Sequence, residues 1–173
     1  MITEVISSVE KKAASLAADT ARRLKELSIT VALAESCTAG LVAALLANTD
    51  GASSLLWGSY VCYAREAKVS MLGLDDNALS AYGLVSGETA SLMVKAALER
   101  SGADMAVSVT GLAGPRGDGR VPVGTVWAAA GFQNAEARVK KFYFEGERNI
   151  VRFKAAAAAL ELALGVVDIK YEK

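Results

Sequence analysis

The sequence contains no histidine among its 173 residues. A Ser-His-Asp triad, a Cys-His pair and a histidine metal ligand are therefore all excluded. Cysteine is also scarce, because Cys37 and Cys62 are the only two. Two cysteines are too few for a disulfide framework, and a zinc site would need histidine partners as well. We therefore expect a reduced, cytoplasmic compartment and a protein that needs neither a metal nor another cofactor.

The chain also lacks an excess of either charge, because 19 Lys and Arg residues balance 19 Asp and Glu residues. Such a chain produces no broad field that would attract a phosphate backbone or an anionic membrane. Long apolar runs are missing too: AAAAALELALGVV is interrupted by Glu161 and is too short to span a bilayer. Near the N-terminus, Glu4, Glu10 and Lys11 stand where a secretion signal needs an apolar stretch. We expect a soluble intracellular protein that binds neither nucleic acid nor a membrane.

Apolar residues make up 53% of the sequence, which suits one compact domain over residues 1–173. The same high share favours self-association, so we expect a homo-oligomer, either a dimer or a larger assembly. Between residues 5 and 27, apolar or small residues recur every three or four positions with charged residues between them. This spacing predicts an amphipathic helix within residues 1–28 that packs on the rest of the domain.

Helical and strand patterns alternate along the remaining chain, which favours a three-layer α/β domain. The two final strand patterns flank the turn GFQNAE and predict a hairpin, so the sheet should be mixed. Strands are predicted at residues 29–34, 55–64, 103–110, 123–130 and 137–144, and further helices at residues 41–48, 65–73, 75–83, 86–100 and 147–164.

The stretch AESCTAG, residues 34–40, joins a buried strand to a helix. Free N–H groups at such a turn can bind a phosphate or stabilise an oxyanion. If Ser36 is a nucleophile, its base must be a lysine with a lowered pKa, a carboxylate or a tyrosine, since histidine is absent. Cys37 competes for the role, because a helix N-terminus lowers a thiol pKa. The alternative is plain helix capping by Ser36 or Thr38.

Three more polar segments follow apolar runs or begin a helix. YAREAK, with Tyr63, Glu66 and Lys68, closes the second predicted strand, and local pattern alone is typical of a solvated strand end. TGLAGPRGDG after the third strand is either an anion-holding loop or a long turn. Arg148 and Arg152 lie one helical turn apart and can hold a phosphate or a carboxylate, or simply lie on the surface. Because ligands bind at the carboxyl edge of open α/β sheets, these segments are expected to meet.

Taken together, five segments resemble the C-terminal domain of the CinA (competence/damage-inducible) proteins, whose stand-alone members include nicotinamide mononucleotide deamidases. The resemblance covers roughly residues 29–164, and its segments stand in the family's order and spacing. They are AESCTAG, GSYVCYAREAKVSMLG, GLVSGETA, SVTGLAGPRGDGRVPVGTVW and EGERNIVR.

The resemblance implies three α/β/α layers around a mixed five-stranded sheet. It also implies hydrolysis of the carboxamide of nicotinamide mononucleotide, which gives nicotinate mononucleotide and ammonia and recycles the pyridine nucleotide. Ser36 matches the family's nucleophile, Lys68 its general base and Tyr63 the tyrosine of the same motif. The N–H groups from Thr38 to Gly40 are then expected to receive the oxyanion.

The same resemblance implies that the glycine-rich loop and the motif EGERNIVR bind the substrate. Thr110, Gly111 and Gly114 in the loop, together with Arg152, are expected to hold the ribose phosphate and so orient the amide. A catalytically inactive nucleotide-binding module of the same fold, linked to competence or DNA damage, is the alternative function.

Two segments depart from the family's motifs. Ala39 stands where the family has a second glycine, and its methyl group lies where backbone and substrate are expected to approach. Ala64 and Arg65 replace a small hydroxyl residue and an amide in YAREAK. Both departures are expected to alter the pocket.

Overall fold

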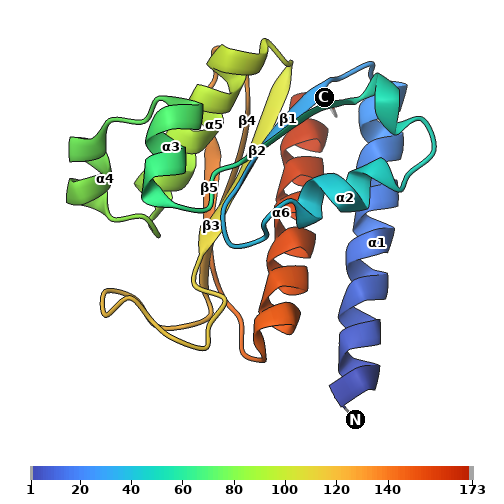
Figure 1. The fold of residues 1–173 in the computed structure, drawn as a ribbon. Helices are drawn as coiled ribbons and strands as arrows, with labels where there is room; N and C mark the ends of the chain where they lie inside the picture. Colours follow the sequence, from blue (N-terminus) through green and yellow to red (C-terminus); the bar gives the residue numbers. More distant parts are fainter. Residues whose placement is uncertain (1, 172–173) are drawn as a thin grey trace.

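The computed structural model describes residues 2–171, so residues 1, 172 and 173 of the predicted domain lie outside the described chain. Helices and strands alternate along it (Figure 1). The elements are α1 (Ile2–Glu26), β1 (Val31–Glu35), α2 (Leu41–Ala47), the short 3-10 helix η1 (Ala52–Ser54), β2 (Leu56–Val61), α3 (Arg65–Leu72), α4 (Asp76–Tyr82), α5 (Gly87–Ser101), β3 (Met105–Gly111), β4 (Thr125–Phe132), β5 (Arg138–Tyr143) and α6 (Arg148–Tyr171).

The five strands form one mixed sheet, as predicted, and their order in it is β2-β1-β3-β4-β5. β1 is parallel to both β2 and β3, whereas β4 is antiparallel to β3 and β5. Every residue of β1 is buried, which fits its continuous apolar run and its central place. β1, β2 and β3 therefore end at the same edge of the sheet, and the segments that follow them meet there.

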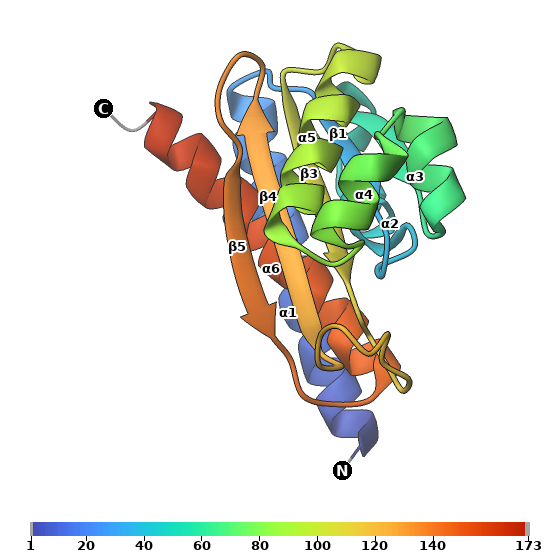
Figure 2. The same ribbon diagram turned by 90° about the vertical axis from the view of Figure 1, so that its left-hand side faces the viewer.

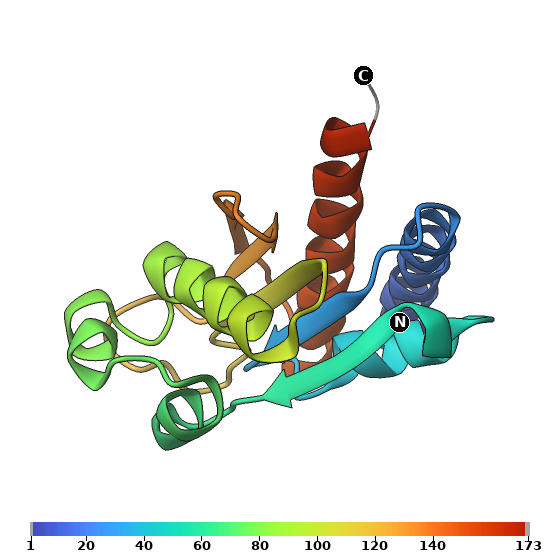
Figure 3. The ribbon, with the colours of Figure 1, turned by 90° about the horizontal axis from the view of Figure 1, so that it is seen from above.

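Helices cover both faces of the sheet, so the three-layer α/β/α architecture is confirmed. α5 packs against β1, β3 and β4, with α3 and α4 beside it, while α6 packs against β3 and β4 on the opposite face. The two sides are separated most clearly when the molecule is viewed from above (Figure 3). The turned view shows the long β4–β5 hairpin beside α5, with the loop after β3 at the lower end (Figure 2).

α1 packs on the outer side of α6 rather than directly on the sheet. Both helices bury small residues: Ala13 and Ala17 on α1, and Ala155 and Ala159 on α6, are all fully buried. The hydroxyl of Thr20 joins the two helices by donating to Leu160 O at 3.3 Å. No helix within residues 2–171 is both long enough and apolar enough to cross a membrane.

One predicted boundary is wrong in a way that matters for the site. The second strand was expected to run to Ala64, but β2 ends at Val61, and α3 begins at Arg65. Lys68 lies on this helix, which was predicted for residues 65–73, but it is only 1% exposed, so the solvated surroundings expected from local pattern are wrong. The helical period carries Lys68 inward and leaves neighbouring residues of α3 outside.

Enlarging an alanine on α6 tests the close packing of this helix. Ala159→Leu should lower the free energy of unfolding by about 1–3 kcal/mol, because the added methylenes have no space in a filled core. The control Glu161→Ala, at an exposed position of the same helix, should change it by less than about 0.5 kcal/mol. Urea denaturation measures both. Equal stability of Ala159→Leu and wild type would contradict the packing described.

Candidate active site

Pairing of β1 with β3 fixes the position of Ser36, the candidate nucleophile. The Ser36 N–H donates to Val109 O at 2.9 Å, so the strand ladder continues one residue beyond β1. The chain then turns through Ala39 and Gly40, whose φ angles of 51° and 88° both lie in the left-handed region. Ser36 is 7% exposed, which leaves its hydroxyl at the base of a cavity rather than on the open surface.

Lys68 brings an amine to the Ser36 hydroxyl from α3. Its Nζ lies 3.0 Å from Ser36 Oγ and 2.8 Å from Cys62 O, within hydrogen-bonding distance of both. The residue that supplies this carbonyl is fixed in turn, because the Cys62 N–H donates to Glu35 O at 2.9 Å. The predicted pair of Ser36 and Lys68 is therefore in direct contact, although 32 positions separate the two residues in the sequence.

Burial lowers the pKa of Lys68 from the 10.5 of an ordinary lysine, because the ammonium form loses its hydration. Cys62 and Cys37 oppose this shift to a smaller extent. Over residues 2–171, no carboxylate forms an ion pair with Lys68 that would restore the charged form. A neutral amine at this place can accept the Ser36 proton.

Cys37 also lines the cavity, but its surroundings do not favour a thiolate. Burial raises the pKa of the thiol to about 12, so it is protonated at neutral pH. The expectation that a helix N-terminus lowers this pKa is wrong, because desolvation outweighs the favourable interactions with Lys68 and Arg152. Ser36 is the better-supported nucleophile of the two.

Capping of α2 differs from the sequence-based expectation as well. Neither Ser36 nor Thr38 caps the helix, whose N-cap residue is Gly40. The carboxylate of Glu35 accepts the N–H groups of Val42 and Ala43 instead, at 3.1 and 3.0 Å. A strand residue thus reaches across the turn to the first helical turn, which no local capping rule anticipates. The Thr38 hydroxyl is buried without a partner in the described chain.

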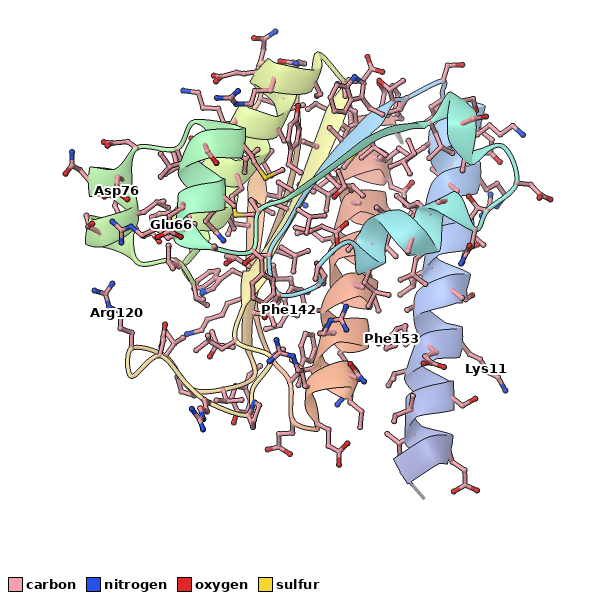
Figure 4. All side chains as sticks on the ribbon, viewed as in Figure 1. Lys11, Glu66, Asp76, Arg120, Phe142 and Phe153 are labelled. Carbon is pink, nitrogen blue, oxygen red and sulfur yellow. The ribbon has the colours of Figure 1, made fainter. Side chains whose placement is uncertain are left out.

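A cavity of about 240 Å³ opens above Ser36 and Lys68. It lies between the start of α3, the segment that connects α4 to α5, and the loop after β3. Arg120 on this loop approaches Gly83, and the labelled side-chain view shows Arg120 on the same side as α4 (Figure 4). The lining residues are Ser36, Cys37, Tyr63, Lys68, Leu84, Val85, Thr110, Gly111, Leu112, Ala113, Gly114, Arg116, Asp118 and Arg148.

Most of the predicted site residues meet in this cavity. Beside the Ser36–Lys68 pair, the predicted residues that line it are Tyr63, Thr110, Gly111 and Gly114. The Thr110 hydroxyl donates to Leu84 O at 2.7 Å and ties the end of β3 to the opposite wall. Among the predicted contacts, Thr38, Gly40 and Arg152 do not line the cavity.

The two arginines of α6 play different structural parts. Arg148 lines the cavity and donates hydrogen bonds to the hydroxyl of Tyr63 and to Gly114 O. Arg152, the predicted substrate contact, instead donates to Thr38 O at 2.8 Å. The helical spacing alone could not distinguish them, because both arginines begin the same helix.

Sequence reasoning singled out none of six further lining residues. Leu84 and Val85 lie in GLVSGETA, a segment quoted for the family resemblance without a role, and Leu112, Ala113, Arg116 and Asp118 lie within the glycine-rich loop. By contrast, Arg65, one of the two departures expected to alter the pocket, turns away to bind Asp76 Oδ1 at 2.6 Å and does not line the cavity. Its effect on the pocket is therefore smaller than the motif comparison suggested.

A larger hollow of about 600 Å³ lies between α5 and the turn that joins β4 to β5. Two of its three charged residues, Lys95 and Glu99, approach within 3.9 Å of each other, exposed and on one helix. Across residues 2–171, no three His, Cys, Asp or Glu side chains gather as metal ligands would.

The model of the CinA C-terminal domain matches residues 13–167 of this sequence. The chain belongs to this family. Among the relatives, the nicotinamide-nucleotide amidohydrolase PncC of Enterobacter agglomerans is 39% identical over 158 residues, which cover 90% of this chain and 95% of that protein. A CinA-like protein of Akkermansia muciniphila is 41% identical over 148 residues, which cover 85% of this chain.

Family members differ in length. The Akkermansia protein is covered over only 35% of its length, so this chain spans about a third of the CinA-like relatives it matches. Two solved structures match this chain over most of its length. The competence/damage inducible protein CihA from Agrobacterium tumefaciens superposes on it with a TM-score of 0.85 at 35% sequence identity. The match covers 90% of this chain and 95% of that one. The competence damage-inducible protein A (ComA) from Klebsiella pneumoniae has the same TM-score at 30% identity, covering 93% and 99%.

The lowered pKa of Lys68 predicts a pH-dependent cost to stability. The unfolded chain binds one more proton than the folded chain between the lowered pKa and 10.5, so wild-type stability should rise with pH through this window. Lys68→Met removes the titrating group. The stability of wild type relative to Lys68→Met should therefore be lowest below the lowered pKa of Lys68, and should rise as pH approaches 10.5.

Urea denaturation at several pH values measures this difference. Lys11→Met is the control, because the Lys11 side chain is exposed and points away from the molecule (Figure 4), and its difference from wild type should show no trend. A constant difference between wild type and Lys68→Met over the whole range would show that Lys68 is as easily charged in the folded protein as in the unfolded chain.

Ala39 carries backbone strain that glycine would remove. Its φ of 51° is costly for a residue with a side chain, so Ala39→Gly should stabilise the protein by about 1 kcal/mol. The opposite change at the next residue, Gly40→Ala at φ 88°, should destabilise it by a similar amount. Thermal unfolding compares the two variants, and a loss of stability in Ala39→Gly would count against the strain.

Proposed function

We propose that the protein is an amidohydrolase that converts nicotinamide mononucleotide to nicotinate mononucleotide and ammonia, in pyridine nucleotide recycling. The observation that carries this proposal is the buried Lys68 Nζ, 3.0 Å from Ser36 Oγ at the base of a cavity. The family relative named as a nicotinamide-nucleotide amidohydrolase, covered over 95% of its length, supports the choice of substrate.

The first half-reaction uses the neutral amine of Lys68 as the base. Ser36 Oγ forms a bond to the carboxamide carbon while its proton passes to Lys68 Nζ. Collapse of the tetrahedral intermediate breaks the carbon–nitrogen bond, and the proton on Lys68 passes to the leaving nitrogen, which departs as ammonia. Tyr63, on the same cavity wall, is the second group that can supply a proton at this step.

The second half-reaction hydrolyses the acyl-enzyme and regenerates free Ser36. Water attacks the acyl group on Ser36, Lys68 accepts the proton of the water, and that proton returns to Ser36 Oγ as nicotinate mononucleotide forms. Lys68 therefore cycles between amine and ammonium, and the lowered pKa keeps both forms within reach.

Oxyanion stabilisation fits the loop after β3 better than the predicted turn. The Ala39 N–H is already used by Ser36 O at 3.0 Å, and Thr38 and Gly40 do not line the cavity. The N–H groups of Ala113 and Gly114 belong to lining residues and have no acceptor within the described chain. They are available to an anionic oxygen of the substrate.

Cations on the cavity wall suit the phosphate of the nucleotide. Arg116 and Arg148 both line the cavity, and Tyr63 and Gly114 hold the Arg148 guanidinium in place. Asp118 on the same loop is a suitable acceptor for ribose hydroxyls. Binding energy from the sugar phosphate would then orient the carboxamide over Ser36.

Ammonia release from nicotinamide mononucleotide by the purified protein tests the proposal. Ser36→Ala and Lys68→Ala should each lower kcat by roughly 1,000-fold or more, because each removes one half of the nucleophile–base pair. Cys37→Ala is the matched control and should retain turnover, because the Cys37 thiol stays protonated. If folded wild-type protein binds the nucleotide and releases no ammonia, the protein is a nucleotide-binding module without this activity.

A further inference from the structure

The carboxylate of Glu35 is the most heavily used buried polar group next to the site, yet it does not line the cavity. Glu35 is 1% exposed. Its Oε1 accepts the Ala43 N–H at 3.0 Å and the Ser59 hydroxyl at 3.1 Å, while Oε2 accepts the Val42 N–H at 3.1 Å. One carboxylate therefore joins β1, the first turn of α2 and β2.

The backbone of Glu35 also takes part in the placement of Lys68. Glu35 O accepts the Cys62 N–H at 2.9 Å, and Cys62 O lies 2.8 Å from Lys68 Nζ. The same Nζ is 3.0 Å from Ser36 Oγ, on the residue that follows Glu35. These contacts form a closed ring from Glu35 through Cys62 and Lys68 to Ser36, so a shift of Glu35 would change the distance between nucleophile and base.

Arg152 holds the middle of the same turn from α6. Its guanidinium donates to Thr38 O at 2.8 Å, two residues after Ser36. Arg152 does not line the cavity, so this hydrogen bond links it to the reacting atoms through the turn. The next residue of the turn is Ala39 at φ 51°, a conformation that persists only when its surroundings impose it.

We propose that Glu35 and Arg152 are positioning residues that anchor turn 36–40, Glu35 by joining the residues on either side of the turn and Arg152 by holding Thr38 at its middle, and that they thereby hold Ser36 Oγ against Lys68 Nζ. The inference rests on the proposed Ser-Lys chemistry and does not depend on the identity of the amide. A misplacement of about 1 Å at reacting atoms can lower a rate by about 100-fold. Loss of either anchor should therefore slow catalysis without removing any group that contacts the substrate.

The carboxylate suits this task better than a neutral side chain. It accepts three donors at once, and a negative charge at the start of α2 interacts favourably with the helix dipole. Glu35→Gln keeps the size of the side chain but replaces one acceptor oxygen by a donor, which faces an N–H group. The variant therefore loosens the anchor with little change in volume.

Two readouts separate positioning from substrate binding. The first is steady-state release of ammonia from nicotinamide mononucleotide, analysed as kcat and KM. The second is the rate at which a small alkyl phosphonofluoridate labels Ser36, which reports the reactivity of the hydroxyl without the nucleotide. Glu35→Gln and Arg152→Gln should each lower kcat and the labelling rate in parallel, by about 10- to 100-fold, with KM changed by less than about threefold.

Each variant has a matched control away from the turn. The Asp104 carboxylate accepts the Thr30 N–H at 2.8 Å and its hydroxyl at 2.6 Å, at the opposite edge of the sheet, so Asp104→Asn removes a similar contact. Arg65 donates to the Asp76 carbonyl oxygen at 2.8 Å, so Arg65→Gln matches Arg152→Gln. Both controls should lower stability in thermal unfolding while kcat and the labelling rate stay at the wild-type values.

The outcomes are distinguishable from failure of the proposed function. If wild type is labelled at Ser36 but releases no ammonia, the substrate assignment fails and the labelling rates still decide the positioning role. Folded Glu35→Gln with wild-type labelling and kcat would overturn the proposal for Glu35. If Arg152→Gln raises KM alone, Arg152 contacts substrate and the proposal is overturned there. Should Glu35→Gln not fold, Ser59→Ala, which removes one donor to Oε1, takes its place with the same expected direction.

Discussion

Burial of one amine without a carboxylate partner is the constraint on which the site depends. Lys68 is nearly inaccessible, and its described polar contacts are a carbonyl and a hydroxyl, neither of which can neutralise an ammonium ion. Burial favours the neutral form of such a group, so the loss of hydration that lowers stability also makes a free amine more available. In the proposed mechanism this amine takes the place that histidine has in Ser-His-Asp hydrolases.

The mixed sheet makes this placement possible. Because β1, β2 and β3 are parallel, the segments that follow them lie at one edge of the sheet, and each segment contributes different residues to the site. Ser36, the proposed nucleophile, follows β1; Lys68, the proposed base, lies one helical turn into α3 after β2; and the glycine-rich loop follows β3. β4 runs antiparallel to β3. After the β4–β5 hairpin, α6 covers the face of the sheet opposite α5, and its Arg148 and Arg152 lie at the same edge as the site.

The sequence was sufficient for the layers, the mixed sheet and most of the helix and strand positions, because buried strands and amphipathic helices differ in period. It also offered Ser36 as a candidate nucleophile, through its place between a strand and a helix, with helix capping as the alternative. The role of Lys68 came only from the family resemblance, since the local pattern around it is typical of a solvated strand end. Glu35 was not predicted as a helix cap, because the contact crosses a tight turn that spacing rules do not describe.

The absence of a carboxylate beside Lys68 in the described chain has a consequence for how a reaction cycle would end. Any neutral amide hydrolysed at Ser36 becomes an acid, whose anion then lies next to the amine. A carboxylate anion there favours the ammonium form of Lys68, so the product acts as the counter-ion that no described carboxylate of the protein provides. The product would thus hold the base in its inactive form until it departs, and its release would restore the free amine for the next substrate.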